Sequence, residues 1–220
     1  MATPFPTQLV NLLAAFLLLL AFAMLAQRRV LTLIKMFAWQ GAALAASTLI
    51  VAWSTGQHHL YFSAALTLAL KVMLIPWALH RLIDRLNVRW DVETLINIPT
   101  TMLIGIGLAI FAFALAAPIA QMASTLTRST LGIALAVVLL SFLMMIVRRK
   151  AVPQVIGFLS MENGLFFAAT SATYGMPLVV ELGIALDVLV GTLIFGIFFF
   201  HIREQFDSLD IRHMEKLKED

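Results

Sequence analysis

An uncharged stretch of 17 residues reads Leu131-Gly-Ile-Ala-Leu-Ala-Val-Val-Leu-Leu-Ser-Phe-Leu-Met-Met-Ile-Val147, and the basic triplet Arg148-Arg149-Lys150 follows it directly. A helix needs about 17 to 25 mostly apolar residues to cross the hydrocarbon core of a bilayer. Basic side chains are favoured just outside that core, where water and lipid phosphates solvate them. The stretch therefore predicts a transmembrane helix that ends at Val147.

The whole chain has the same apolar character. Of its 220 residues, 61% are hydrophobic and 12% are charged, and the mean hydropathy is +0.96. This is more apolar surface than one water-soluble core can bury, so the bilayer must act as the solvent. We therefore predict an all-α membrane protein with about seven transmembrane helices. The predicted spans are Gln8–Ala26, Leu31–Trp53, Leu60–Leu79, Ile98–Ala117, Leu131–Val147, Val152–Ala172 and Leu178–Phe200.

The basic residues are divided unequally between the two sides of this seven-helix domain, which we assign to residues 1–200. Of the 15 Lys and Arg residues, Lys35 and Lys71 lie within spans and Arg128 falls on the less basic side. The positive-inside rule places the more basic side in the cytoplasm. The sequence therefore predicts an amino terminus outside and a cytoplasmic tail at residues 201–220. The basic residues of the cytoplasmic side are Arg28, Arg29, Arg81, Arg85, Arg89, Arg148, Arg149, Lys150, Arg203, Arg212, Lys216 and Lys218.

Residues 1–80 and 125–200 show a weak internal similarity. With one helix between them, the two halves would have the same orientation, as in transporters built from parallel repeats. Chance similarity between apolar helices is the alternative. The corresponding positions are Arg28-Arg29 and Arg148-Arg149, Gln40-Gly41 and Asn163-Gly164, and Lys71 and Asp187.

The composition excludes several kinds of chemistry. The chain has no cysteine, and its five histidines have no metal-ligand spacing apart from the adjacent His58 and His59. It contains no nucleotide-binding P-loop or GxGxxG pattern, no GxSxG nucleophile motif and no HExxH zinc motif. We expect no catalytic residue, cofactor or metal in this chain, and no nucleic-acid partner.

Three charged residues lie near the centres of predicted spans, namely Glu162, Asp187 and Lys71. A charge at this depth costs about 2.5 to 3.5 kcal/mol on insertion scales, so it usually faces protein or water and serves a function. We predict that Glu162 and Asp187 are proton-relay carboxylates. For Glu162 the alternative is a protonated, hydrogen-bonded structural role. Glu181, nearer the outer end of its span, is either a further relay group or a snorkelling or capping carboxylate.

Lys71 lies five residues before Pro76 in the same predicted span. Proline lacks a backbone N–H and crowds the preceding turn, so the sequence predicts a broken helix and a hydrated pocket beside the lysine. A buried lysine can lose its charge. Lys71 therefore either relays protons or pairs with Asp187 or Glu162.

Four further residues are secondary candidates. Asn163 places an amide next to Glu162. His80 and His201 lie at cytoplasmic ends of predicted helices, where an imidazole can pass protons to water or simply mark the interface. Lys35 lies near the cytoplasmic end of its span and can snorkel outward.

The last third of the chain contains two patterns that together are typical of one family. Met161-Glu162-Asn163-Gly164 lies in the helix that follows the basic triplet, and Val180-Glu181-Leu-Gly-Ile-Ala-Leu-Asp187 lies in the next helix. This part of the chain resembles hydrogenase-4 component E, a membrane subunit that accompanies the formate hydrogenlyase type of nickel–iron hydrogenase.

Residues 148–200 are also similar, more distantly, to the K subunit of respiratory complex I and to the C component of Mrp-type antiporters. In the K-subunit pattern, an arginine pair opens a helix with one buried glutamate, and a second buried glutamate lies on the next helix. The first falls opposite Leu159, three residues before Glu162, and the second falls close to Asp187.

The resemblance implies a non-catalytic, cofactor-free subunit of a complex I-like hydrogenase or oxidoreductase in a bacterial or archaeal cytoplasmic (inner) membrane. Its partners would be antiporter-like and quinone-site-like membrane subunits and a peripheral hydrogenase arm with nickel–iron and iron–sulfur centres. Its buried charges would serve proton translocation or energy coupling.

Other functions are open on the residues alone. A subunit of an Mrp-like cation/proton antiporter would use the same carboxylates without a redox partner. A purely structural membrane adaptor would need the buried charges for helix packing. A stand-alone transporter is less favoured, because Asn11, Gln40 and Asn163 supply few polar groups for a substrate site.

Overall fold

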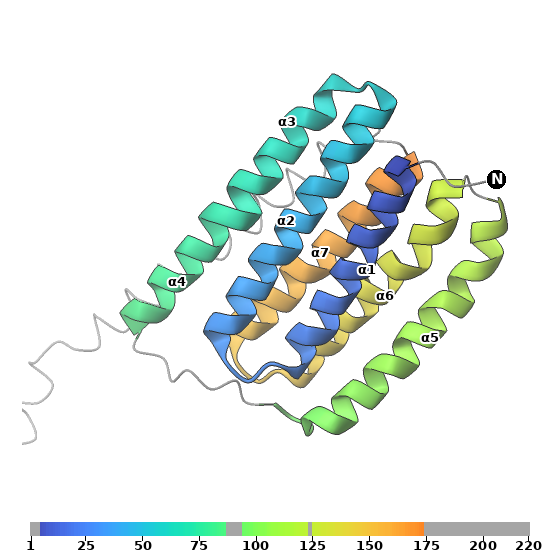
Figure 1. The fold of residues 1–220 in the computed structure, drawn as a ribbon. Helices are drawn as coiled ribbons and strands as arrows, with labels where there is room; N and C mark the ends of the chain where they lie inside the picture. The colour runs from blue at the N-terminus through green and yellow to red at the C-terminus, as the bar shows by residue number, and fades with distance from the viewer. Residues whose placement is uncertain (1–4, 87–93, 123–124, 174–220) are drawn as a thin grey trace, which may run out of the picture. The chain divides into compact units, whose positions relative to one another are not determined.

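The computed structural model of the protein describes residues 5–86, 94–122 and 125–173, all of which belong to one compact unit of the chain. These residues are almost entirely helical (Figure 1). The elements in chain order are α1 (Phe5–Ala26), α2 (Val30–Thr55), α3 (His58–Thr67), η1 (Leu68–Leu74), α4 (Ile75–Leu86), α5 (Ile98–Met122), α6 (Thr125–Val147) and α7 (Ala151–Thr173). Here η1 is a π-helical segment, and α3, η1 and α4 follow one another without a gap to form one continuous rod.

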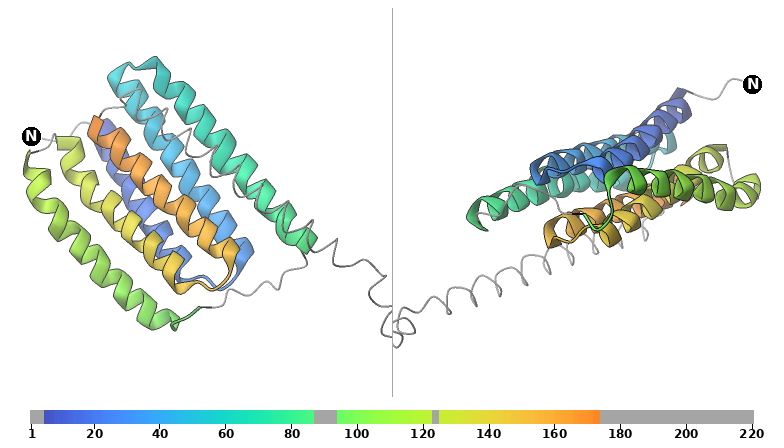
Figure 2. Two further views of the ribbon diagram at one scale, coloured as in Figure 1. Left: turned by 180° about the vertical axis from the view of Figure 1, so that it is seen from behind. Right: turned by 90° about the horizontal axis from the view of Figure 1, so that it is seen from below.

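The helices form two layers, which the right-hand view of Figure 2 shows edge-on. One layer holds α1, α2 and the α3–η1–α4 rod, and the other holds α5, α6 and α7. Between the layers, α1 packs on α6 and α2 packs on α7. Short turns join α1 to α2 and α6 to α7, and both turns lie at the same end of the bundle (Figure 1). The centres of α2 and α7 therefore face each other across the layers.

Within the described residues, five helical stretches are long and apolar enough to cross a membrane. They coincide with the first five predicted spans to within a few residues, so the prediction of several membrane-length apolar helices is confirmed. α7 coincides with the predicted sixth span but is more polar. The predicted span Leu178–Phe200 and the tail at residues 201–220 lie outside the described residues. The five stretches are Phe5–Ala26, Val30–Thr55, His58–Arg81, Ile98–Pro118 and Thr130–Val147.

Large apolar side chains cover the outside of the bundle. Trp53, Phe62 and Leu103 have exposed fractions of 69%, 70% and 70%. In water such a surface would favour aggregation, whereas the hydrocarbon of a bilayer solvates it. Polar side chains such as Gln40 and Thr48 are buried instead. This distribution is compatible with a multi-pass membrane protein.

Small residues hold α6 and α7 close together. A Cβ atom added to Gly164 would lie 3.0 Å from two valine side chains of α6, and one added to Gly157 would lie 2.9 Å from a methionine of α6. Ser160 lies between these glycines on the same face, and its hydroxyl oxygen is 2.8 Å from that of Ser141 in α6. Close approach of small residues and interhelical hydrogen bonds are the main ways in which helices associate in lipid. The position of α7, and hence of Glu162, depends on this contact.

We predict that Gly164→Leu destabilises the bundle by about 1 to 3 kcal/mol, because the longer side chain overpacks the α6–α7 contact. The matched control is Gly107→Leu in α5, since Gly107 is exposed and an added Cβ would meet nothing within 4 Å. Thermal unfolding of the purified chain in detergent micelles measures both variants. Equal losses of melting temperature in the two variants would contradict the packing explanation.

Candidate functional site

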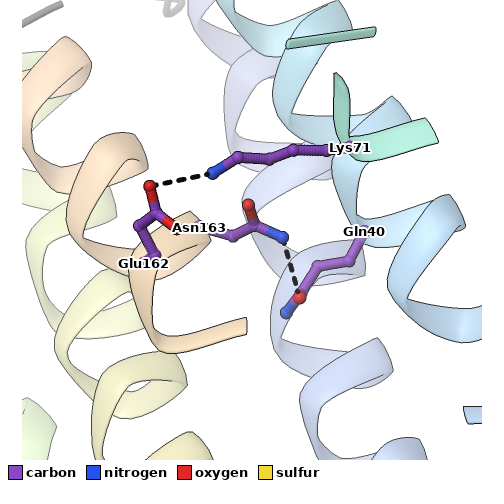
Figure 3. Close-up of polar contacts among 4 residues, drawn as sticks. All are labelled: Gln40, Lys71, Glu162 and Asn163. Atoms are coloured by element: carbon purple, nitrogen blue, oxygen red, sulfur yellow. Dashed lines mark hydrogen bonds and ion pairs between the residues drawn. The ribbon is translucent and has the colours of Figure 1, made fainter. Parts of the chain in front are cut away.

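Lys71 and Glu162 face each other inside the bundle (Figure 3). Lys71 Nζ lies 3.6 Å from Glu162 Oε1, and the two side chains are 1% and 3% exposed. Lys71 belongs to η1 in one layer, and Glu162 lies at the middle of α7 in the other. Opposite charges attract strongly where water is excluded, and each partner offsets part of the desolvation cost of the other. The pair is therefore a buried electrostatic link between the layers.

The backbone around Lys71 is a π-helix rather than an α-helix. The N–H of Ile75 donates to the carbonyl of Leu70, five residues earlier, and Pro76 has no N–H to donate to the Lys71 carbonyl. The prediction of a broken helix at Pro76 is wrong: the rod continues through the proline, and the missing N–H is accommodated by a π-helical segment between α3 and α4. Such segments are rare and are often found at functional sites.

Gly41 of α2 lets the lysine approach. A Cβ atom added to Gly41 would lie 3.0 Å from Lys71 Cβ and 3.5 Å from the Lys71 carbonyl oxygen. The absence of a side chain at Gly41 allows η1 to pack directly on the α2 backbone. The lysine side chain then extends past α2 to reach α7 (Figure 3).

An aromatic ring completes the surroundings of the ammonium group. Lys71 Nζ lies 5.9 Å from the centroid of the Phe166 ring. Phe166 follows Glu162 by four residues and so lies on the same face of α7. A cation over a ring face is favoured by the quadrupole of the ring, and more strongly where water is absent.

A pair of buried amides lies next to the charged pair. Asn163 Nδ2 donates to Gln40 Oε1 over 3.2 Å, and both side chains are 0% exposed. Among the described residues, Asn163 Oδ1 and Gln40 Nε2 have no hydrogen-bond partner. One acceptor and one donor are thus available for a water or for a rearranged network beside the charges.

Three polar residues of α7 point to three different neighbours. Ser160 bonds to α6, Glu162 pairs with η1 and Asn163 bonds to α2. Consecutive residues of an α-helix are about 100° apart around its axis, so this short segment turns its polar groups toward all three elements. The polar side chains of this segment therefore connect α6, α7, α2 and η1 near the middle of the bundle.

In chemical terms, the Lys71–Glu162 pair has an ionised form and a neutral form. Transfer of one proton from the Lys71 ammonium to the Glu162 carboxylate would convert two charges into two neutral groups. The 3.6 Å separation of Nζ and Oε1 is longer than a hydrogen bond, so transfer needs a closer approach or a bridging water.

The other predicted residues lie elsewhere. Lys35 is exposed on α2, and His80 is exposed on α4. Asp187, Glu181 and His201 lie outside the described residues. The structure thus brings Lys71, Glu162 and Asn163 together, and of the two partners considered for Lys71 it shows Glu162.

Sequence reasoning did not distinguish Arg148 from its neighbour Arg149. Arg148 is 1% exposed, and its Nη2 donates to the carbonyls of Met24 (3.0 Å) and Leu25 (2.8 Å) at the end of α1. These carbonyls are among the last of the helix, where cations are favoured. Burial lowers the pKa of Arg148 to about 10, so the guanidinium stays charged at neutral pH. Nothing in the local sequence separates Arg148 from the exposed Arg149.

Among the described residues, no group of three or more His, Cys, Asp or Glu side chains is placed to hold a metal ion. The polar residues that do converge are two amides, two hydroxyls and one pair of opposite charges. A cation would have to compete with the Lys71 ammonium for the Glu162 carboxylate.

Comparison with known proteins gives one family relationship. "Uncharacterized protein Rv0085" of Mycobacterium tuberculosis (strain ATCC 25618 / H37Rv) is 32% identical over 212 residues, which cover 96% of each chain. This chain belongs to the family of Rv0085. No protein-family model matches the chain, and no solved structure does. The similarity to Rv0085 extends over nearly the whole length, so it is not confined to one apolar helix.

We predict that Lys71 and Glu162 are energetically coupled. Lys71→Met and Glu162→Gln should each destabilise the protein, and the double variant should lose about 0.5 to 3 kcal/mol less than the sum of the single losses. Unfolding of the four proteins in detergent micelles measures the coupling. Lys35→Met combined with Glu162→Gln is the matched control, and additive losses are expected there because Lys35 is exposed. Additive losses for Lys71 and Glu162 would contradict the prediction.

Proposed function

We propose that this chain is a cofactor-free membrane subunit of a complex I-like, membrane-bound hydrogenase or related oxidoreductase, in which Lys71 and Glu162 relay protons. The observation that carries the proposal is the buried ion pair, with 3.6 Å between Nζ and Oε1. The patterns around Glu162 and Asp187 that resemble hydrogenase-4 component E supply the biological setting. Catalysis, with nickel–iron and iron–sulfur centres, belongs to partner subunits in this proposal.

The energetics of burial support a functional role for the pair. Replacing a buried ion pair by well-packed apolar residues is often neutral or stabilising, so stability alone does not require these charges. Ionisable groups inside a membrane bundle usually mark the pathway of a proton or ion. The neighbouring amides and serine hydroxyls add polar groups that can orient a relayed proton.

The remaining relay groups follow from the sequence. Asp187 and Glu181 are the next carboxylates of the proposed path, and Asn163 polarises the surroundings of Glu162. His80 and His201 exchange protons with water on the cytoplasmic side, and the exposure of His80 suits this role. Lys35 serves as an interfacial anchor.

The membrane setting of the proposal is a bacterial or archaeal cytoplasmic (inner) membrane. We infer seven spans, an outer amino terminus and a cytoplasmic tail from the distribution of basic residues. The position of Arg28-Arg29 and Arg148-Arg149-Lys150 at one end of the bundle supports this orientation (Figure 1). The partners in this setting are other membrane subunits and a peripheral redox arm.

We predict that Glu162→Gln lowers redox-coupled proton movement per assembled complex at least tenfold, because the amide cannot accept and release the proton. The measurement uses the intact complex in proteoliposomes, with proton uptake and electron transfer recorded together. Glu162→Asp should retain part of the proton movement, since it keeps a carboxylate.

The matched control for this experiment is Thr48→Val in α2. It removes a buried hydroxyl, which donates to the Leu44 carbonyl over 3.0 Å, but it removes no titratable group. Thr48→Val should leave the ratio of protons to electrons unchanged. If Glu162→Gln reduced assembly and proton movement in equal proportion, the chain would be a structural adaptor rather than a relay.

An Mrp-like antiporter subunit is the second candidate, because the ion pair itself needs no redox partner. The two functions differ in what surrounds the chain. Purification of the chain from its native membrane should yield subunits with iron–sulfur clusters if the first proposal is correct. Antiporter subunits without iron would favour the second.

A further inference from the structure

Five basic residues gather where two turns of the chain meet. We call this cluster the basic end and define it as Arg28, Arg29, Arg148, Arg149 and Lys150. The first two lie between α1 and α2, and the last three lie between α6 and α7. The hydrogen bonds from Arg148 to the carbonyls at the end of α1 hold the two turns against each other. The lower part of Figure 1 shows these turns side by side.

The two turns of the basic end carry only basic charges in their own sequence. Residues 24–30 and 147–154, which form the two turns and their flanks, contain no Asp or Glu. Arg28, Arg29 and Arg149 are exposed, Lys150 is half-buried and Arg148 is buried beneath them. The Nε and Nη1 atoms of Arg148 have no hydrogen-bond partner among the described residues. Like charges gathered in two adjoining turns repel one another, so an anion between the turns would stabilise them.

An apolar stripe leads from the basic end along α6. Phe142 and Ile146 are 46% and 67% exposed. They are four residues apart and therefore lie on one face of the helix, within two turns of Arg149. A ligand with a negative head and an apolar tail would match both the cationic turns and this stripe.

We propose that the basic end binds an anionic phospholipid, with its phosphate between the two turns and an acyl chain along Phe142 and Ile146. Phospholipids with at least one net negative charge, such as phosphatidylglycerol and cardiolipin, fit this description. A zwitterionic lipid is disfavoured because its amine would face the arginines. The proposal rests on the membrane setting given above, but it does not depend on proton relay.

The choice of a lipid over a soluble partner follows from the geometry. Basic clusters between helices at a membrane surface attract anionic headgroups. The apolar stripe begins at Ile146, two residues before Arg148, and lies on a helix long and apolar enough to span the membrane. A water-soluble protein could contact the charges but not the stripe, and inorganic phosphate has no tail to occupy it.

The test measures lipid binding to the purified full-length chain by native mass spectrometry and by thermal shift in detergent micelles. Phosphatidylglycerol should bind and stabilise the chain, whereas phosphatidylcholine and inorganic phosphate should do so weakly. The double variant Arg149→Gln/Lys150→Gln should bind phosphatidylglycerol about 30-fold more weakly, because each basic residue contributes about 1 kcal/mol near anionic lipid. The matched control Arg81→Gln/Arg128→Gln removes the same charge outside the two turns and should bind normally.

A second variant keeps the test informative if the charge variant does not insert correctly. Ile146→Ser leaves all five basic residues in place and should weaken phosphatidylglycerol binding by shortening the apolar contact. Equal binding of phosphatidylglycerol and phosphatidylcholine would overturn the proposal, as would equal weakening in the control variant or full stabilisation by inorganic phosphate. Glu162→Gln should bind the lipid normally, so a failure of the relay hypothesis would be seen separately.

Discussion

The attraction between Lys71 and Glu162 constrains the arrangement of three elements. The two charges lie 3.6 Å apart in the middle of a bundle whose outer surface is apolar. Neither is readily accommodated there without an opposite charge, because the interior offers little solvation. η1 must therefore stay within a side-chain length of α7, with α2 packed beside both. The hydrogen bond that Asn163 Nδ2 donates to Gln40 Oε1 links α2 to α7 beside the charged pair.

Glycines make this arrangement possible at two points. Gly41 admits the backbone of η1 on one side of α2, and Gly164 admits α6 on one side of α7. Each glycine directly follows one of the two hydrogen-bonded amides. The positions that correspond in the weak internal similarity, Gln40-Gly41 and Asn163-Gly164, thus lie together at the centre of the bundle. The similarity itself remains a prediction, since its last helix lies outside the described residues.

The chain separates two kinds of charged region. At mid-height, opposite charges lie close together on two side chains that are almost fully buried. At the basic end, charges of one sign gather at one end of the bundle, and Arg148 joins the two turns through main-chain carbonyls of α1. In the proposed relay, transfer of a proton from Lys71 to Glu162 would remove both charges of the first region. The second suits a constant positive field, because arginine keeps its charge.

The sequence by itself determined the helical class, the five membrane-length helices that the structure describes out of about seven predicted, and the residues that are costly to bury. Hydropathy, helix length and the depth of Lys71 and Glu162 are properties of local sequence, and no partner is needed to evaluate them. The tertiary structure decided that Lys71 pairs with Glu162, that Asn163 bonds to Gln40, and that Arg148 is buried while Arg149 is exposed. These outcomes depend on how each helix is rotated and shifted against its neighbours. Packing between segments far apart in the chain sets that register, and local hydropathy carries no information about it.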